Sequence, residues 1–156
     1  MSGKVGGAGS KSGVVSDKTQ IYAHLDDCST SYGDMTFSTL EGDSTNITQD
    51  GASVTLVKPG IYMITCCWNW DGSNAIERYV FGHIESVSGS RGTDTMSITN
   101  DQLAAGEQFA VYGGATATFS GYFVGGDTFK FRYVSGGGTS ATNRADTHAS
   151  IFKLSR

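Results

Sequence analysis

The chain has 156 residues, of which 22 are glycine and one is proline, and it carries a formal net charge of −4. This length is typical of one domain with a sizeable core, and an aromatic content of 11% excludes a disordered chain. The acidic balance argues against nucleic acid and anionic membranes as partners.

The first segment, residues 1–18, consists largely of glycine, serine and lysine. A segment of this composition buries too little apolar surface to order itself. The stretch VGGAGSKSG (5–13) ends like a phosphate-binding loop, but Ser10 replaces a required glycine and no strand precedes it. We interpret residues 1–18 as an extended arm that docks on another protein, and residues 19–156 as the domain. The residues assigned to docking are Lys4, Val5, Gly6, Gly7, Gly9, Lys11, Val14 and Val15.

From residue 19 onward, apolar and polar residues alternate with period two, which is the pattern of β-strands. The predicted strands are 20–25, 36–40, 53–57, 61–70, 76–84, 94–99, 107–112, 115–123, 127–134 and 147–154. Turn signals such as GDSTN and VGGD separate them. One helical turn is expected at 99–107, with Thr99 or Asn100 as its N-cap. We therefore expect an all-β fold, an antiparallel jelly-roll sandwich of about 8–10 strands.

The longest predicted strand, 61–70, has two different faces. One face carries large side chains that can be buried: Tyr62, Ile64, Cys66, Trp68 and Trp70. The other face is mixed: Ile61, Met63, Thr65, Cys67 and Asn69. A strand with this pattern is expected to pack on both sides, with its apolar face against the core and its mixed face against a neighbouring subunit.

The cysteines and histidines point to no reaction centre. Cys28, Cys66 and Cys67 are odd in number and two are adjacent, which favours free thiols over a disulfide framework. No C-x-x-C motif predicts a zinc site. Asp146 and His148 could share one face of the last strand as an acid–base pair, but no G-x-S-x-G nucleophile elbow accompanies them. We expect structural histidines, no catalytic residue, no cofactor and no metal, and hence a protein that is not an enzyme.

Two further groups of residues leave alternatives open. One group is acidic and comprises Asp26, Asp27, Asp34, Glu41 and Asp43. Their carboxylates could bind calcium, or they could form a solvated surface. The absence of an EF-hand loop motif favours the solvated surface. The aromatic residues form a sugar-stacking platform, or they belong to the core and a subunit interface. They are Trp68, Trp70, Tyr112 and Tyr122.

Three motifs follow one another along the domain: VTLVKPGIYMITCCWNW (54–70), TFSGYFVGGDTFKFRY (118–133) and ASIFKL (149–154). Their order resembles the trimeric jelly roll shared by tumour necrosis factor-like proteins and the globular heads of complement one-q. The opening VGGAGSKSGVV (5–15) is similar to the start of small structural proteins of tailed bacteriophages.

Together the two resemblances imply a virion protein. We expect a homotrimer that decorates and cements the capsid, with its arm on the phage major capsid protein. Because the first 20 residues lack the apolar stretch of a secretory signal, we expect the chain to be made in the host cytoplasm, not secreted, and to be located on the capsid surface. The residues expected at the trimer interface are Ile61, Met63, Thr65, Tyr122, Phe152 and Leu154.

Two alternatives stand beside this interpretation. The first is the tip of a tail fibre, in which loops 71–75, 86–92 and 135–144 bind a host-surface glycan or protein. The second is a carbohydrate-active enzyme that uses paired carboxylates such as Asp94 and Asp101.

Overall fold

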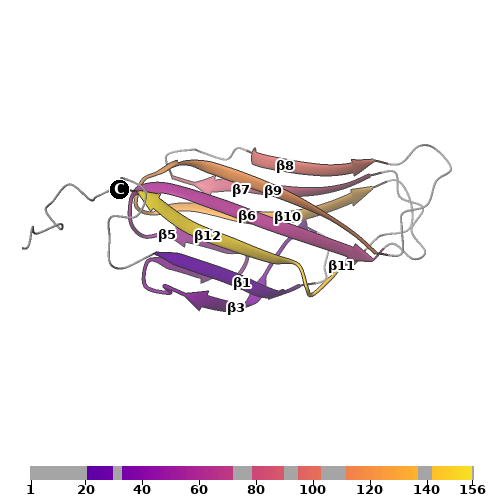
Figure 1. The fold of residues 1–156 in the computed structure, drawn as a ribbon, viewed down its shortest axis with the longest axis horizontal. Helices are drawn as coiled ribbons and strands as arrows, with labels where there is room; N and C mark the ends of the chain where they lie inside the picture. Colours follow the sequence, from indigo (N-terminus) through magenta and orange to yellow (C-terminus); the bar gives the residue numbers. More distant parts are fainter. Residues whose placement is uncertain are drawn as a thin grey trace, which may run out of the picture.

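A computed structural model describes residues 21–29, 33–71, 79–89, 95–102, 112–136 and 142–155. These residues form two antiparallel sheets that pack face to face (Figure 1). No helix that could cross a membrane occurs in this part of the chain. The arm predicted at 1–18 lies outside the described residues.

Sheet A is built around the longest strand, β6, which β9 and β12 flank. Its order is β9 (Tyr112–Phe123), β6 (Gly60–Asp71), β12 (His148–Ser155), β1 (Tyr22–Cys28) and β3 (Phe37–Gly42), with β11 (Thr142–Asn143) beside the end of β6. Sheet B is built around β10. Its order is β4 (Ile47–Asp50), β5 (Ser53–Leu56), β10 (Asp127–Gly136), β7 (Tyr79–Ser88) and β8 (Thr95–Gln102), with β2 (Gly33–Asp34) beside β10.

The core lies between the two sheets and follows the predicted alternation. From sheet A, β6 contributes Tyr62, Ile64, Cys66 and Trp68, all fully buried; from sheet B, β10 contributes Phe129, Phe131 and Tyr133. The aromatic rings meet edge to face, with centroids 5.5 Å apart for Phe129 and Phe131. Trp68 donates a hydrogen bond from Nε1 to the Met35 sulfur, 3.0 Å away. Because Trp68 has no exposed surface, the sugar-stacking role considered for it is wrong.

The structure corrects two expectations from the sequence. The helical turn expected at 99–107 is wrong at its start. Residues up to Gln102 belong to β8, and Gln102 lies opposite Tyr79 of β7. Strand pairing thus overrides the capping preference of Thr99 and Asn100. Asp146 lies in a turn before β12 rather than on the last strand, because β12 begins at His148.

The expected antiparallel sandwich is confirmed, with more strands than predicted. The additional strands are the short β2, β4 and β11, while the strand predicted at 107–112 lies, except for Tyr112 of β9, outside the described residues. Each has at most four residues, too few for the alternation of a half-buried strand to be visible in the sequence.

Candidate functional site

The candidate site is the outer face of sheet A, defined as the side chains of β9, β6, β12 and β1 that point away from the core. The register fixes its members, since residues opposite one another in a sheet point to the same side. Met63, for example, lies opposite both Ser120 and Phe152. The members are Tyr122, Ser120, Thr118 and Thr116 of β9; Ile61, Met63, Thr65 and Cys67 of β6; Phe152, Ser150 and His148 of β12; and Tyr22, His24 and Asp26 of β1.

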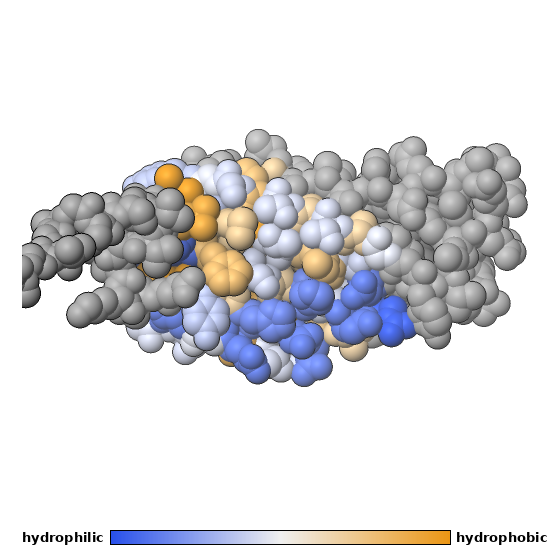
Figure 2. All heavy atoms as spheres, in the orientation of Figure 1, coloured by the Kyte–Doolittle hydropathy of each residue, from blue (hydrophilic) through white to orange (hydrophobic). Residues whose placement is uncertain are grey.

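One end of this face is apolar and partly open to solvent. Ile61, Tyr122 and Tyr22 are exposed by 39%, 53% and 43%, and the rings of Tyr22 and Phe152 are stacked with centroids 6.3 Å apart. Figure 2 shows the apolar side chains gathered at this end and the hydrophilic ones towards β1 and β3. Contiguous exposed apolar surface of this kind typically marks a binding surface.

The middle of the face is uncharged and rich in hydroxyl groups. Thr65 and Thr118 lie opposite one another on β6 and β9, with their hydroxyl oxygens 3.0 Å apart. Ser120 and Ser150 extend this strip to the neighbouring positions. Where hydroxyl groups hydrogen-bond to one another across neighbouring strands, a partner can cover the surface without burying an unpaired charge.

The other end of the face is polar and brings together residues that are distant in the sequence. The rings of His24 and His148 have centroids 5.7 Å apart, and Cys67 lies opposite His148. Thr116 donates a hydrogen bond to the Cys67 sulfur over 3.3 Å. No pattern in the sequence predicts the meeting of His24 and His148, because it depends on the pairing of β1 with β12.

The Asp146 carboxylate does not pair with His148. Instead it accepts two hydrogen bonds from the Arg144 guanidinium, at 3.0 and 3.1 Å. These bonds hold the pKa of Asp146 below its usual value. His148 contacts Asp146 through its Nδ1, which lies 3.2 Å from the backbone oxygen. The proposed acid–base pair therefore is not formed.

Five of the six residues expected at a trimer interface share this face: Ile61, Met63, Thr65, Tyr122 and Phe152. Leu154 is half-buried and falls in the irregularity of β12 between Lys153 and Ser155. That these residues meet a second copy stays a prediction.

The remaining sequence candidates fall largely outside the described residues. Asp94 lies outside them, and Asp101 is placed only as a position on β8. Of the three loops proposed for a receptor, each is described only in part. In the part of the chain that the structure describes, no group of three His, Cys, Asp or Glu residues is arranged to hold a metal ion.

All three cysteines are free thiols, as expected. Burial, with smaller contributions from the Cys28 and Cys67 thiolates, raises the pKa of the Cys66 thiol well above its usual value. Cys66 is therefore an inert core residue, whereas Cys67 is half-buried on the outer face of sheet A.

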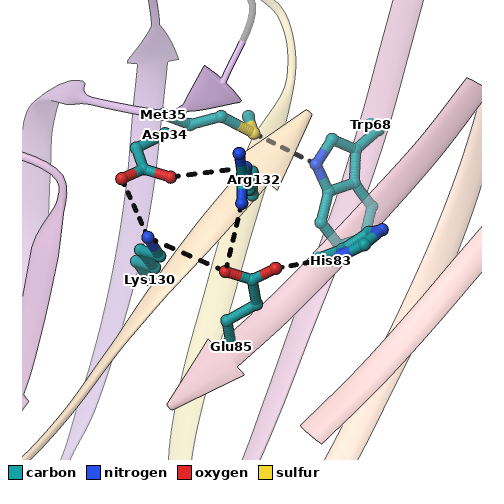
Figure 3. Close-up of polar contacts among 7 residues, drawn as sticks. All are labelled: Asp34, Met35, Trp68, His83, Glu85, Lys130 and Arg132. Carbon is teal, nitrogen blue, oxygen red and sulfur yellow. Dashed lines mark hydrogen bonds and ion pairs between the residues drawn. The ribbon is translucent and has the colours of Figure 1, made fainter. Parts of the chain in front are cut away.

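The outer face of sheet B has the opposite character, because its charges are paired with one another (Figure 3). The Lys130 ammonium lies 2.9 Å from Asp34 and 3.7 Å from Glu85. Arg132 lies 3.6 Å from Asp34 and 3.9 Å from Glu85, which also contacts His83 at 2.9 Å. This network joins β2, β7 and β10 and offers a partner little unsatisfied charge.

A groove of about 510 Å³ lies between the edge strands β3 and β4. Its lining has no charged residue and comprises Thr36, Phe37, Ser38, Leu40, Ser44, Ile47, Thr48, Gln49 and Gly51. Gln49 crosses it, donating hydrogen bonds from Nε2 to the backbone oxygens of Phe37 (2.7 Å) and Gly51 (3.0 Å). Since Gln49 already bonds the β3 backbone, the groove is a weaker candidate than the outer face of sheet A.

Comparison of the whole chain with known proteins identifies its fold. No protein-family model matches the sequence, and no curated protein is similar to it in sequence. The crystal structure of murine APRIL at pH 5.0 superposes with a TM-score of 0.60 and 12% identity, over 87% of this chain and 100% of that chain. Eiger TNF from S. frugiperda superposes with a TM-score of 0.61 and 12% identity, over 88% and 94%. The expected jelly roll is thus confirmed, and the chain has the tumour necrosis factor-like form of it.

Proposed function

We propose that this protein is a non-enzymatic structural component of a tailed-phage particle. In this proposal it forms a homotrimer through the outer face of sheet A and decorates the capsid, to which residues 1–18 attach it. The shell is stabilised because each trimer bridges neighbouring capsid subunits.

The contrast between the two outer faces of the sandwich carries this proposal. Sheet B presents charges that are paired internally, whereas sheet A presents exposed Ile61, Tyr122 and Tyr22 beside a strip of hydroxyls. Covering the apolar end removes these side chains from water at about 25 cal/mol per Å² of buried apolar area. A stable interface between copies needs at least about 1,000 Å² in total.

Three arms on one trimer support attachment to a repeated lattice. Ordering about 15 residues costs roughly 1–2 kcal/mol for each residue. Once one arm of a trimer is bound, the other two bind at high effective concentration. A trimer that binds a symmetric surface through three arms therefore offsets the cost of ordering each arm, whereas a single chain with one arm does not.

The mass of the protein in solution tests the interface. Thr118→Arg places a guanidinium in the middle of the outer face of sheet A, where Thr118 lies opposite Thr65. We expect wild type to have the mass of a trimer by light scattering and this variant to have that of a monomer.

Thr128→Arg is the matched control. Thr128 lies opposite Thr55 on the outer face of sheet B, with the hydroxyl oxygens 3.4 Å apart, so the two substitutions are chemically alike. Thr128→Arg should remain trimeric. A wild-type monomer would contradict the trimer, and an effect of both variants alike would contradict the assignment of the face.

Deletion of residues 1–16 tests the arm separately. We expect the shortened chain to remain trimeric and to lose co-sedimentation with capsids. If capsid binding persists without the arm, or if the full chain binds host cells rather than capsids, the decoration role is wrong and the tail-fibre alternative replaces it.

A further inference from the structure

Two imidazoles lie side by side at the polar end of the outer face of sheet A. His24 of β1 and His148 of β12 have ring centroids 5.7 Å apart and ring planes at 43°. Two imidazoles that bind one tetrahedral zinc ion have centroids about 5 Å apart, because each Zn–N bond is about 2.0–2.1 Å long. The separation of the His24 and His148 rings is close to this value.

The hydrogen bonds of His148 leave its outer nitrogen available. Its Nδ1 lies 3.2 Å from the backbone oxygen of Asp146, and because a carbonyl oxygen only accepts, Nδ1 carries the proton. The neutral ring then has its lone pair on Nε2. Metal-binding histidines characteristically donate their other N–H to a carbonyl or carboxylate in this way.

His24 is placed similarly, with one nitrogen engaged and the other open. Its Nδ1 lies 3.4 Å from the Ser150 hydroxyl, and its Nε2 lies 3.9 Å from the Asp26 carboxylate. The second distance exceeds that of a hydrogen bond. The carboxylate thus attracts a cation to His24 without occupying the nitrogen.

We propose that His24 and His148 form half of a site for a divalent transition-metal ion of the zinc type, which donors from a second copy of this chain complete. The inference rests on the proposed function, because it requires copies to meet through the outer face of sheet A. Zinc takes four ligands, and the described residues of one copy offer no group of three. In this proposal the second copy supplies the remaining ligands, and the metal in turn links the two copies.

The charged and soft groups around the pair favour such an ion. Asp26 and Glu41 bring negative charge, and Glu41 lies opposite His24 on β3. The nearby guanidinium of Arg144 is held by the Asp146 carboxylate, which reduces its repulsion of a metal. The Cys67 thiol lies opposite His148 but forms no group of three donors with the two histidines, so it contributes only a soft sulfur beside the site.

Zinc binding by the metal-free full-length protein tests this site at neutral pH. Equilibrium dialysis with Zn²⁺ measures affinity, and light scattering with Zn²⁺ or with EDTA measures assembly. We expect Zn²⁺ to bind and to lower the concentration at which the assembly dissociates. His24→Ala and His148→Ala should each weaken Zn²⁺ binding by more than the roughly 10–100-fold lost when an outer-shell partner is removed.

His83→Ala is the matched control, because His83 lies on the outer face of sheet B beside Glu85. It should bind Zn²⁺ as wild type does, and circular dichroism should show all three variants folded. Binding that is absent, that survives loss of both His24 and His148, or that leaves assembly unchanged would overturn the metal site. A protein that is trimeric with and without Zn²⁺ and binds none keeps the proposed function, whereas a monomer under both conditions overturns both proposals.

Discussion

At the scale of single residues, Tyr62 combines a core position with a polar contact. Its ring packs edge to face on Phe123, with centroids 5.9 Å apart, and its hydroxyl donates a hydrogen bond to the Lys58 backbone oxygen over 2.8 Å. Burial, and to a smaller extent the charge of Asp43, raise the pKa of Tyr62 to about 12. The folded state therefore holds the phenolic proton more tightly than the unfolded chain, in which a tyrosine titrates near 10.

This difference predicts a loss of stability in alkali that depends on Tyr62. The stabilising contribution is fully present below about pH 10 and is lost as the pH rises to about 12; two pKa units correspond to about 2–3 kcal/mol of unfolding free energy. In Tyr62→Phe the unfolding free energy should fall less over this range, as measured by urea denaturation. An identical alkaline loss in Tyr62→Phe and wild type would contradict the assignment.

At the scale of elements, β6 and β7 of the two sheets pack closely at Trp68 and Gly82. The Trp68 ring of β6 lies directly over Gly82 of β7, so that a Cβ at Gly82 would lie 2.6 Å from the ring atoms Cε2 and Cε3. Glycine is required here for space rather than for backbone conformation. The ring also contacts Phe131 of β10, at 6.5 Å between centroids, so a displaced Trp68 disturbs both sheets.

We therefore expect Gly82→Ala to lower the unfolding free energy by about 1–3 kcal/mol, as overpacking of a core does. The measurement is urea denaturation of Gly82→Ala, Trp68→Phe and the double variant. Trp68→Phe shortens the ring, so the two substitutions should cost less together than the sum of their separate effects. Strict additivity would show that Gly82 does not act through Trp68.

The same elements show what the sequence can predict. Alternation along β6 and β10 predicts the buried rings, because period two depends only on neighbours along the chain. The motifs around Gly60 and Gly126 indicate the jelly roll by their resemblance to the tumour necrosis factor-like proteins. The meeting of His24 with His148 was not predictable, because it depends on the register between β1 and β12. Ile61 and Tyr122, which the sequence predicts at an interface, could be placed on one face because both lie on long alternating strands.

At the scale of the whole molecule, one outer face of the sandwich carries charges that pair with one another, and the other exposes apolar side chains to solvent. The ion pairs of sheet B satisfy their charges within one chain, whereas the apolar side chains Ile61, Tyr122 and Tyr22 of sheet A remain exposed in one chain. If copies associate through that face, folding and assembly become a single equilibrium, since unfolding a chain then also exposes its neighbours.

The melting temperature should therefore rise with protein concentration. For a trimer that unfolds to monomers, a tenfold increase in concentration adds about 1 kcal/mol of stability per chain. In a chain of this size that corresponds to about 2–4 °C, measurable by calorimetry at two concentrations. Thr118→Arg should melt at one temperature at both concentrations, because its interface is broken, and Thr128→Arg should keep the wild-type dependence. A wild-type melting temperature that does not change with protein concentration would contradict the coupling of folding to assembly through the apolar end of sheet A.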